Sequence, residues 1–243
     1  VQETSWNWSK AAEAHAQLLA RYPKNADAHH FYGYVMMNLY LPERWLDEHR
    51  KAAALDPLSA LDQENIGEAL HVLGRNDEAI VEYQKALTLD PNLVFTLAQL
   101  CVSYAERGTV GDAKKILMER LIAVDGDGNH TTRCRAAIAG REPDPKKALR
   151  ALAQDAERAN QAGKVNESLV GLIYAQAGDF DSAFKWFRKA IAIHDSRFFQ
   201  NTIGNLLPAA LIADPRWKAL FDGPALQEWR QARAAVLSGP LDK

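Results

Sequence analysis

The sequence predicts an all-α fold, an α-solenoid in which helical hairpins stack side by side. Small residues recur 34 positions apart, in the pairs Gly33 and Gly67, Gly74 and Gly108, Ala52 and Ala86, and Ala79 and Ala113. Prolines that follow helical stretches share this period of 34, at Pro23, Pro57 and Pro91. Self-similarity at a fixed period of this length is typical of solenoid architectures. We therefore expect stacked hairpins, closed by a C-terminal capping segment.

The sizes of the recurring side chains agree with close packing of paired helices. Small residues such as Gly67 and Ala79 let two antiparallel helices approach closely, and Ala86 leaves room for the next hairpin. Tyr83 and Phe187 are expected to fill the hollow between successive units. One hairpin cannot bury its own apolar face, so stability grows as neighbours stack.

The predicted turns carry suitable residues. Gly74 and Gly178 lie just past a first helix, where glycine adopts positive φ at little cost. Asn76 and Asp179 are predicted to cap the second helix through their side-chain oxygens. The turn chemistry thus agrees with the spacing of small residues.

These residues resemble the tetratricopeptide repeat (TPR). The unit 60–93 has the family's series of residues: Ile66, Gly67, Leu70, Gly74, Ala79, Tyr83, Ala86 and Pro91. Units 94–127 and 164–197 follow it, with aspartate at the proline position, and unit 26–59 is looser, with Trp45 where alanine is usual. The resemblance implies a right-handed TPR superhelix.

The remaining segments depart further from the pattern. Residues 1–25 fit a half repeat, so we expect either a fragment whose partner helix precedes Val1 or a first helix covered by something else. Residues 128–163 are interpreted as a degenerate repeat, which completes a TPR array over 1–197. Residues 198–243 are expected to form cap helices. Aromatic and aliphatic residues of this cap are expected to pack on the 164–197 unit: Trp217, Leu220, Phe221 and Trp229. For Trp6 and Trp8 we favour packing over an exposed patch.

Both ends of the chain resemble the TPR region of bacterial winged-helix transcriptional regulators and nucleotide cyclases. The stretches that carry this resemblance are "YPKNADAHHFYG" near the start and "DPRWKALF" near the end. Neither a DNA-binding domain nor a cyclase domain is present in these residues. The resemblance implies part of a bacterial regulatory or signalling protein.

The net charge and the number of cysteines indicate which partners and which compartment to expect. The net charge of −2 favours neither nucleic acid nor anionic lipid, and we expect no direct nucleic-acid binding and no membrane insertion. Cys101 and Cys134 are too few for a disulfide framework and are interpreted as free thiols, which suits a reducing compartment. A cytoplasmic location is expected, or a periplasmic one if a membrane span precedes this segment.

The candidate catalytic and metal-binding residues do not follow the patterns that such sites require. His29 and His30 are adjacent and do not share a helix face, His49 comes nineteen positions after His30, and no HExxH pattern is present, so no metal site is predicted. A calcium loop needs glycine at its sixth position and glutamate at its twelfth. In the segment that begins with "DGDGNH" at Asp125, these positions hold His130 and Ala136. The segment is therefore interpreted as a flexible connection between repeats. Without a nucleophile–base pattern or a phosphate-binding loop, neither an enzyme nor a cofactor is expected.

The TPR resemblance implies that first helices line a concave groove. The groove residues that follow from it are His30, Tyr34, Asn38, Glu64, Glu68, His71, Val102 and Glu106. The three glutamates make the groove acidic, so a basic or amphipathic protein or peptide is the expected partner. Two alternatives stay open: a small-molecule sensor with a pocket near Tyr34, His71 and Val102, and solvated polar positions without a ligand. Homo-oligomerisation also stays open.

Overall fold

The structure, a computed structural model, describes residues 7–195, 197–202 and 207–238, and in these ranges every regular element is a helix. The prediction of an all-α solenoid is confirmed. The first helices are α1 (Trp8–Arg21), α2 (Ala26–Asn38), α3 (Pro42–Leu55), α4 (Ala60–Val72), α5 (Asn76–Leu89) and α6 (Val94–Arg107). Next come α7 (Val110–Ile116), the π-helical turn η1 (Leu117–Leu121), α8 (Ile122–Asp125), α9 (Asn129–Ala139), α10 (Pro145–Gln161), α11 (Glu167–Gln176) and α12 (Phe180–Ala192). The chain ends through α13 (Phe198–Thr202), α14 (Ala209–Ile212), α15 (Pro215–Asp222), the 3-10 turn η3 (Pro224–Leu226) and α16 (Gln227–Ser238).

Close helix contacts in the hairpins depend on glycine facing an aromatic ring. A Cβ atom added to Gly67 would lie 2.6 Å from Tyr83 Cε1, and one added to Gly171 would lie 2.6 Å from Phe187 Cδ1. Both rings are fully buried. The first helix of each of these hairpins therefore needs a residue without a side chain at this contact.

The turns follow the predicted chemistry, with one difference. Gly74 and Gly178 have φ of 76° and 80°, and Asp179 caps α12 by accepting from the Ser182 amide at 3.1 Å. Asn76, however, is the first residue of α5 and does not cap it. Its Nδ2 donates to the Ser103 carbonyl at 3.2 Å, so the side chain ties α5 to α6 instead of to its own backbone.

Cys101 on α6 and Cys134 on α9 form a disulfide, with their Cα atoms 5.6 Å apart. The prediction of two free thiols is wrong. The bond joins two units, because α9 of the following unit lies directly against α6. The "DGDGNH" segment between them is also defined, since the Asp125 carboxylate accepts from the Thr131 amide at 2.7 Å.

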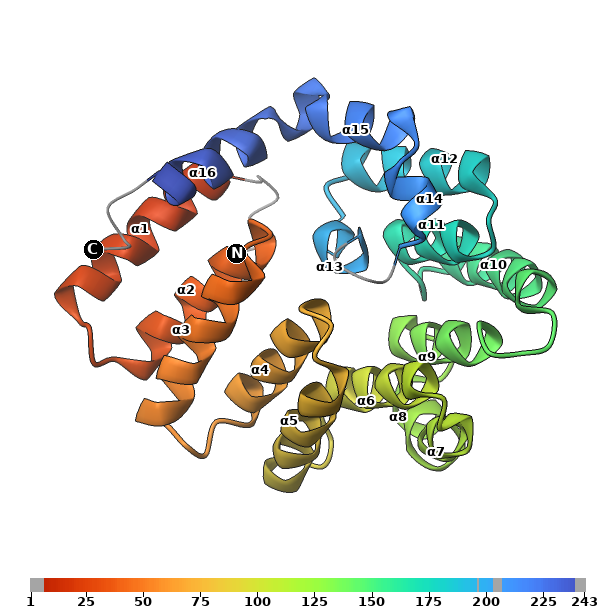
Figure 1. Cartoon of the computed structure of the whole chain (residues 1–243), viewed down its shortest axis with the longest axis horizontal. Coiled ribbons are helices and arrows are strands. Elements are labelled where there is room, and N and C mark those ends of the chain that lie inside the picture. Colours follow the sequence, from red (N-terminus) through yellow and green to blue (C-terminus); the bar gives the residue numbers. More distant parts are fainter. Residues whose placement is uncertain (1–6, 196, 203–206, 239–243) are drawn as a thin grey trace.

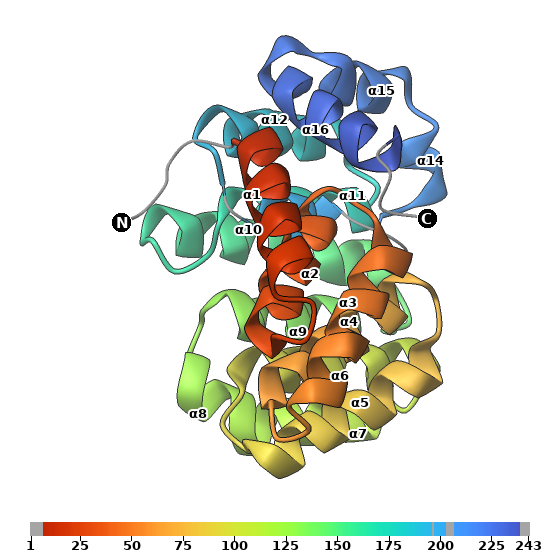
Figure 2. The same ribbon diagram turned by 90° about the vertical axis from the view of Figure 1, so that its left-hand side faces the viewer.

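The helices return on themselves, so that the C-terminal α16 packs against α1 (Figure 1, Figure 2). Glu228 of α16 accepts hydrogen bonds from the Trp8 and Ser9 amides, at 3.0 and 2.7 Å. It thereby satisfies amides at the start of α1 that have no partner inside their own helix. The cover expected for the first helix is thus supplied by the chain's own last helix.

Aromatic side chains fill the space between the cap and the array. Trp217 contacts Phe187 of the 164–197 unit, with ring centroids 6.0 Å apart, as predicted. Trp229 does not pack on that unit: it stacks on Phe199 at 5.3 Å and donates to the Asn38 carbonyl at 2.8 Å. The ring closure carries α16 past the last repeat, which the prediction of a simple cap did not include. Trp8 packs edge-on against Phe199 at 5.7 Å, and Trp6 lies outside the described residues.

The short helix α13 lies inside the ring, facing α4 and α2 (Figure 1). Its Thr202 carbonyl accepts from Tyr40 Oη at 2.9 Å, and Gln200 Nε2 lies 3.7 Å from Met37 Sδ. On its other side, Asn201 Nδ2 donates to Ser168 Oγ of α11 at 2.7 Å. The chain itself therefore occupies part of the concave face. None of the described helices combines the length and apolarity needed to cross a lipid bilayer.

Candidate ligand-binding cavity

The interior of the ring holds a cavity of about 370 Å³ between α4 and α13. Its polar lining comes from segments far apart in the sequence: Tyr34, Glu64, Asn65, Glu68, His130, Arg197 and Gln200. The cavity exists because α13 crosses the concave face without filling it.

One wall is acidic. Glu64 and Glu68 are four residues apart on α4 and so share a helix face. Glu64 accepts from Thr96 Oγ1, whereas Glu68, 4% exposed, has no hydrogen-bond partner among the described residues. Burial raises the pKa of Glu68 to about 8, against the opposing effect of Arg133. Burial also raises the pKa of Glu64.

The facing side is basic. Arg197 lies just before α13, and its guanidinium has no hydrogen-bond or ion-pair partner in the described part of the chain. Arg133 of α9 is buried and donates to Gln99 Oε1 at 3.2 Å and to Asn201 Oδ1. Burial, with a contribution from Arg197, lowers the pKa of His130 to about 4, so this imidazole is neutral near neutral pH. The interior therefore carries both signs of charge and is not uniformly acidic.

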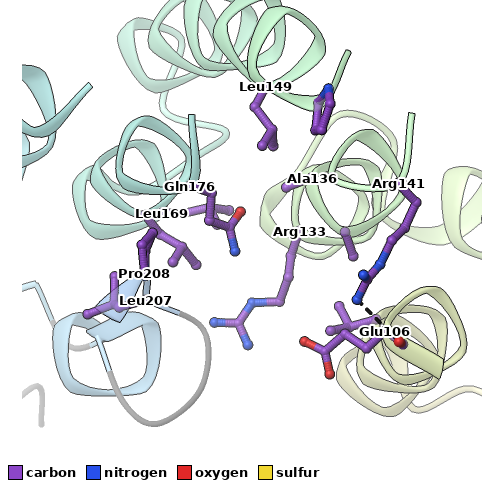
Figure 3. A pocket seen from close by; sticks show the side chains of 14 residues that line it. Glu106, Arg133, Ala136, Arg141, Leu149, Leu169, Gln176, Leu207 and Pro208 are labelled. Carbon is purple, nitrogen blue, oxygen red and sulfur yellow. Dashed lines mark hydrogen bonds between the residues drawn. The ribbon is translucent and has the colours of Figure 1, made fainter. Parts of the chain in front are cut away.

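A second cavity of about 320 Å³ continues along α9, as Figure 3 shows. Val102 and Glu106 border it, together with Arg133 and a largely apolar set that includes Leu149, Leu169 and Leu207. The Glu106 carboxylate meets His71 Nε2 at 2.7 Å, and Arg141 donates to the Glu106 carbonyl at 3.2 Å. Arg133 borders this cavity and also the narrow space beside Arg197.

The structure divides the eight predicted groove residues among three settings. Tyr34, Glu64 and Glu68 line the first cavity, and Val102 and Glu106 line the second. The other three are engaged in polar contacts: His30 with Asp62, Asn38 with the Tyr34 carbonyl at 2.8 Å, and His71 with Glu106. The sequence did not indicate Arg133, His130 or Arg197, because the unit 128–163 lacks the pattern that assigns groove positions and Arg197 falls at the end of the last repeat.

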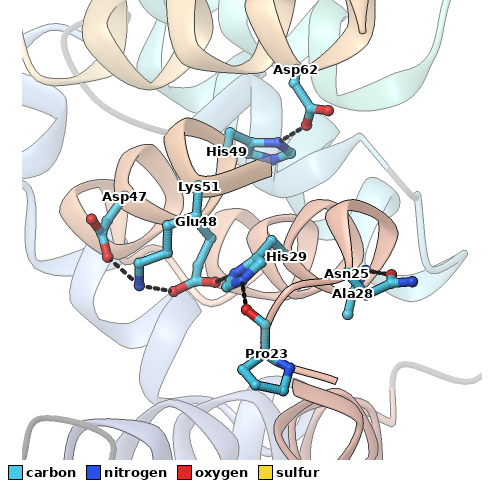
Figure 4. Close-up of polar contacts among 9 residues, drawn as sticks. All are labelled: Pro23, Asn25, Ala28, His29, Asp47, Glu48, His49, Lys51 and Asp62. Carbon is cyan, nitrogen blue, oxygen red and sulfur yellow. Dashed lines mark hydrogen bonds and ion pairs between the residues drawn. The ribbon is translucent and has the colours of Figure 1, made fainter. Parts of the chain in front are cut away.

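The three histidines that were considered as metal ligands in the sequence make polar contacts within the array. Two of them, His29 and His49, are buried and do not face solvent or the groove. His29 Nδ1 lies 2.7 Å from Glu48 Oε2, and His49 Nδ1 lies 2.8 Å from Asp62 Oδ1 (Figure 4). His30 Nδ1 reaches that same Asp62 oxygen at 2.7 Å. Burial opposes the ionisation of Asp62, yet the two histidine contacts hold the pKa of this carboxyl below its usual range.

His30, His49 and Asp62 are residues that could hold a metal ion, because their nitrogen and oxygen atoms lie within 4.8 Å of one another. A tetrahedral zinc site with bonds of about 2.0 Å would keep its ligand atoms about 3.3 Å apart. Here the histidine nitrogens lie 2.7 and 2.8 Å from the carboxylate oxygen. The arrangement fits direct hydrogen bonds, which hold α2 and α3 against α4.

Comparison with known proteins identifies repeats of one family. Residues 60–93 and residues 169–194 each match a family model described as "Tetratricopeptide repeat". The prediction of TPR repeats is confirmed for these two segments. No curated protein matches the chain.

Solved structures with a similar fold include "Crystal structure of MamA", at 20% sequence identity and a TM-score of 0.45, covering 78% of this chain and 90% of that one. A second is "Crystal structure of MamA protein", also at 20% identity and a TM-score of 0.45, covering 78% of this chain and 84% of that one.

Proposed function

We propose that the chain is a protein-interaction module that works by binding, within a bacterial regulatory or signalling protein. TPR repeats generally mediate contacts between proteins, and two segments here match them. The resemblance of both chain ends to the TPR region of bacterial regulators and cyclases supports a place within a regulatory or signalling protein. The Cys101–Cys134 disulfide supports an oxidising compartment, such as the periplasmic alternative considered from the sequence.

The observation that carries the proposal is Glu68. A buried carboxylate without a hydrogen-bond partner among the described residues is costly, and this one borders an open volume. A basic side chain of a partner protein would supply the missing hydrogen bonds, with Glu64 as a second acceptor. Removing such a charge-assisted contact costs about 1.5–3 kcal/mol, or roughly 10- to 100-fold in affinity.

The available space supports a side chain as the inserted group. A helix is about 10–12 Å across, so a single turn of it occupies roughly 420–600 Å³. The cavity of about 370 Å³ is smaller than this. The helix α13 lies inside the ring (Figure 1). We therefore propose that the partner contacts the rim of the ring and inserts one basic group.

An array of synthetic basic, acidic and neutral amphipathic peptides tests this proposal. Wild-type protein is expected to retain the basic peptides, and a Glu64→Gln/Glu68→Gln variant is expected to lose them. A Glu78→Gln/Glu82→Gln variant, altered on α5, is the matched control and should behave as the wild type. An unchanged peptide profile in the first variant would contradict the proposal.

The volume of this cavity also supports a second candidate, a small-molecule sensor. This volume lies within the range of about 300–1,000 Å³ that is common for small-ligand sites. A metabolite library screened by thermal shift tests this candidate, because a ligand that binds the folded state raises the melting temperature.

A further inference from the structure

We infer that the cavity between α4 and α13 recognises a small zwitterion: a ligand that carries a cationic nitrogen and a carboxylate, as a free amino acid does. The inference rests on the proposed use of this cavity as a binding site. It adds an anionic group to the ligand and a binding role for Arg197.

The first support is that acidic and basic groups line one volume from different segments of the chain. Glu64 and Glu68 come from α4, whereas Arg197 enters from the segment that leads into α13. Glu68 and Arg197 are near enough to influence each other electrostatically, yet no ion pair joins them in the described structure. The space between them is therefore open to a ligand that contacts both.

The second support is that Arg197 has spare hydrogen-bonding capacity. The nearest acidic residue in sequence, Asp195, uses its carboxylate oxygens on the Ser168 amide at 3.0 Å and on the Arg197 amide at 2.9 Å. The Arg197 guanidinium is left with its planar set of donors, which matches the geometry of a carboxylate.

The third support is that a ligand of one charge also comes near groups of its own sign, so it is expected to bind less tightly than a ligand that carries both charges. A cation beside Glu68 also lies near Arg133 and Arg197, and an anion beside Arg197 also lies near the α4 carboxylates. A molecule that carries both charges satisfies each wall. The cavity of about 370 Å³ has the volume of roughly a dozen water molecules, which suits a ligand of about that many heavy atoms.

Proton release gives the inference a specific signature. The pKa of about 8 at Glu68 keeps this carboxyl largely protonated near neutral pH while the cavity is empty. The titratable and charged groups around it are Glu64, Tyr34, Tyr83, His130, Arg133 and Arg197. A cationic nitrogen placed against Glu68 favours the ionised carboxylate, so binding is expected to release about one proton.

The experiment is calorimetric titration of the full 243-residue chain with each standard free amino acid. For any that binds, the corresponding amine without the carboxylate and the corresponding acid without the amino group are titrated in parallel. We expect an amino acid to bind, and each truncated analogue to bind roughly tenfold more weakly or worse. In buffers of different ionisation enthalpy, the wild type should release a proton and Glu68→Gln should not.

Two variants and two controls complete the design. Glu68→Gln and Arg197→Gln are each expected to weaken binding by roughly tenfold or more. Glu78→Gln and Arg188→Gln, on exposed helix faces, should leave it unchanged. Circular dichroism of every variant establishes that the helices persist.

The outcomes separate this inference from the proposed function. If free amino acids fail but array peptides with neighbouring basic and acidic residues bind and respond to both variants, a partner protein supplies both charges, the inference is overturned and the proposed function remains. If the amine binds as tightly as the amino acid, or Glu68→Gln weakens binding while Arg197→Gln does not, the inference is overturned and the proposed function remains. If neither variant changes binding of any probe, or if no probe binds, both are overturned.

Discussion

His49 lies against Gly33 in the way that Tyr83 lies against Gly67 and Phe187 lies against Gly171. A Cβ atom on Gly33 would lie 2.5 Å from His49 Nε2, comparable with 2.6 Å at both aromatic contacts. The first hairpin thus keeps the packing of the others but replaces an aromatic ring with imidazole. The replacement adds the hydrogen bond from α3 to Asp62 on α4.

Gly33→Ala is expected to destabilise the protein by about 1–3 kcal/mol, because His49 is fully buried and cannot move away from the added methyl group. The free energy of unfolding in urea measures the effect. The matched control is Gly111→Ala in α7, where an added Cβ meets nothing within 4 Å. That change should be neutral or stabilise by up to about 1 kcal/mol, and equal losses at both positions would contradict this account of the packing.

The free energy of unfolding should depend on pH through Glu68. Its pKa in the folded chain is about 8, above its ordinary value of 4.5. The folded state therefore binds the Glu68 proton more tightly than the unfolded state does. The stability that this proton contributes is fully present below about pH 4.5 and is lost as the pH rises to about 8. In the Glu68→Gln variant, this fall in the free energy of unfolding with rising pH is expected to be absent. Denaturant titrations across this range measure the difference between variant and wild type, and a difference that stays constant with pH would contradict the assignment.

Removal of the disulfide between α6 and α9 should lower the free energy of unfolding by about 2–4 kcal/mol, as is typical when a cross-link that restricts the unfolded chain is lost. A Cys101→Ala/Cys134→Ala variant and the reduced wild type should agree in direction. Mass spectrometry after alkylation without reductant checks the bond, and two alkylated cysteines in the native protein would refute it.

Glu228→Ala is expected to destabilise by about 1 kcal/mol, because the Trp8 and Ser9 amides lose their acceptor. Hydrogen exchange should accelerate in the first turn of α1 and remain unchanged in α4 and α5. Gln227→Ala, at an exposed neighbouring position, is the control. Uniform acceleration throughout the chain would mean that Glu228 acts on the whole fold and not on the α1 contact.

The sequence predicted those parts of the fold that depend on neighbouring residues. The small residues Gly67 and Ala79 recur with the period of one hairpin, so the sequence was enough to find them. Tyr83 and Phe187 were expected between units, but they lie against glycines of their own hairpins. Glu64 and Glu68 were found because they occupy regular positions of a typical repeat. The sequence thus identified one wall of the cavity.

The remaining features depend on how successive hairpins curve. The Cys101–Cys134 bond joins two units, and the contact of Glu228 with Trp8 joins the two ends of the described chain. Arg133 and Arg197 come from segments in which the repeat pattern is weak or ends. No local pattern records which of these residues meet in space.

The contact between α1 and α16 also limits how the architecture can change. In an open solenoid a hairpin can be added or removed and the neighbours simply shift along the axis. Here the angular steps between successive helices must sum to a full turn for the last helix to reach the first. Insertion or loss of one hairpin would separate Glu228 from the start of α1, so the number of hairpins is fixed by geometry as well as by stability.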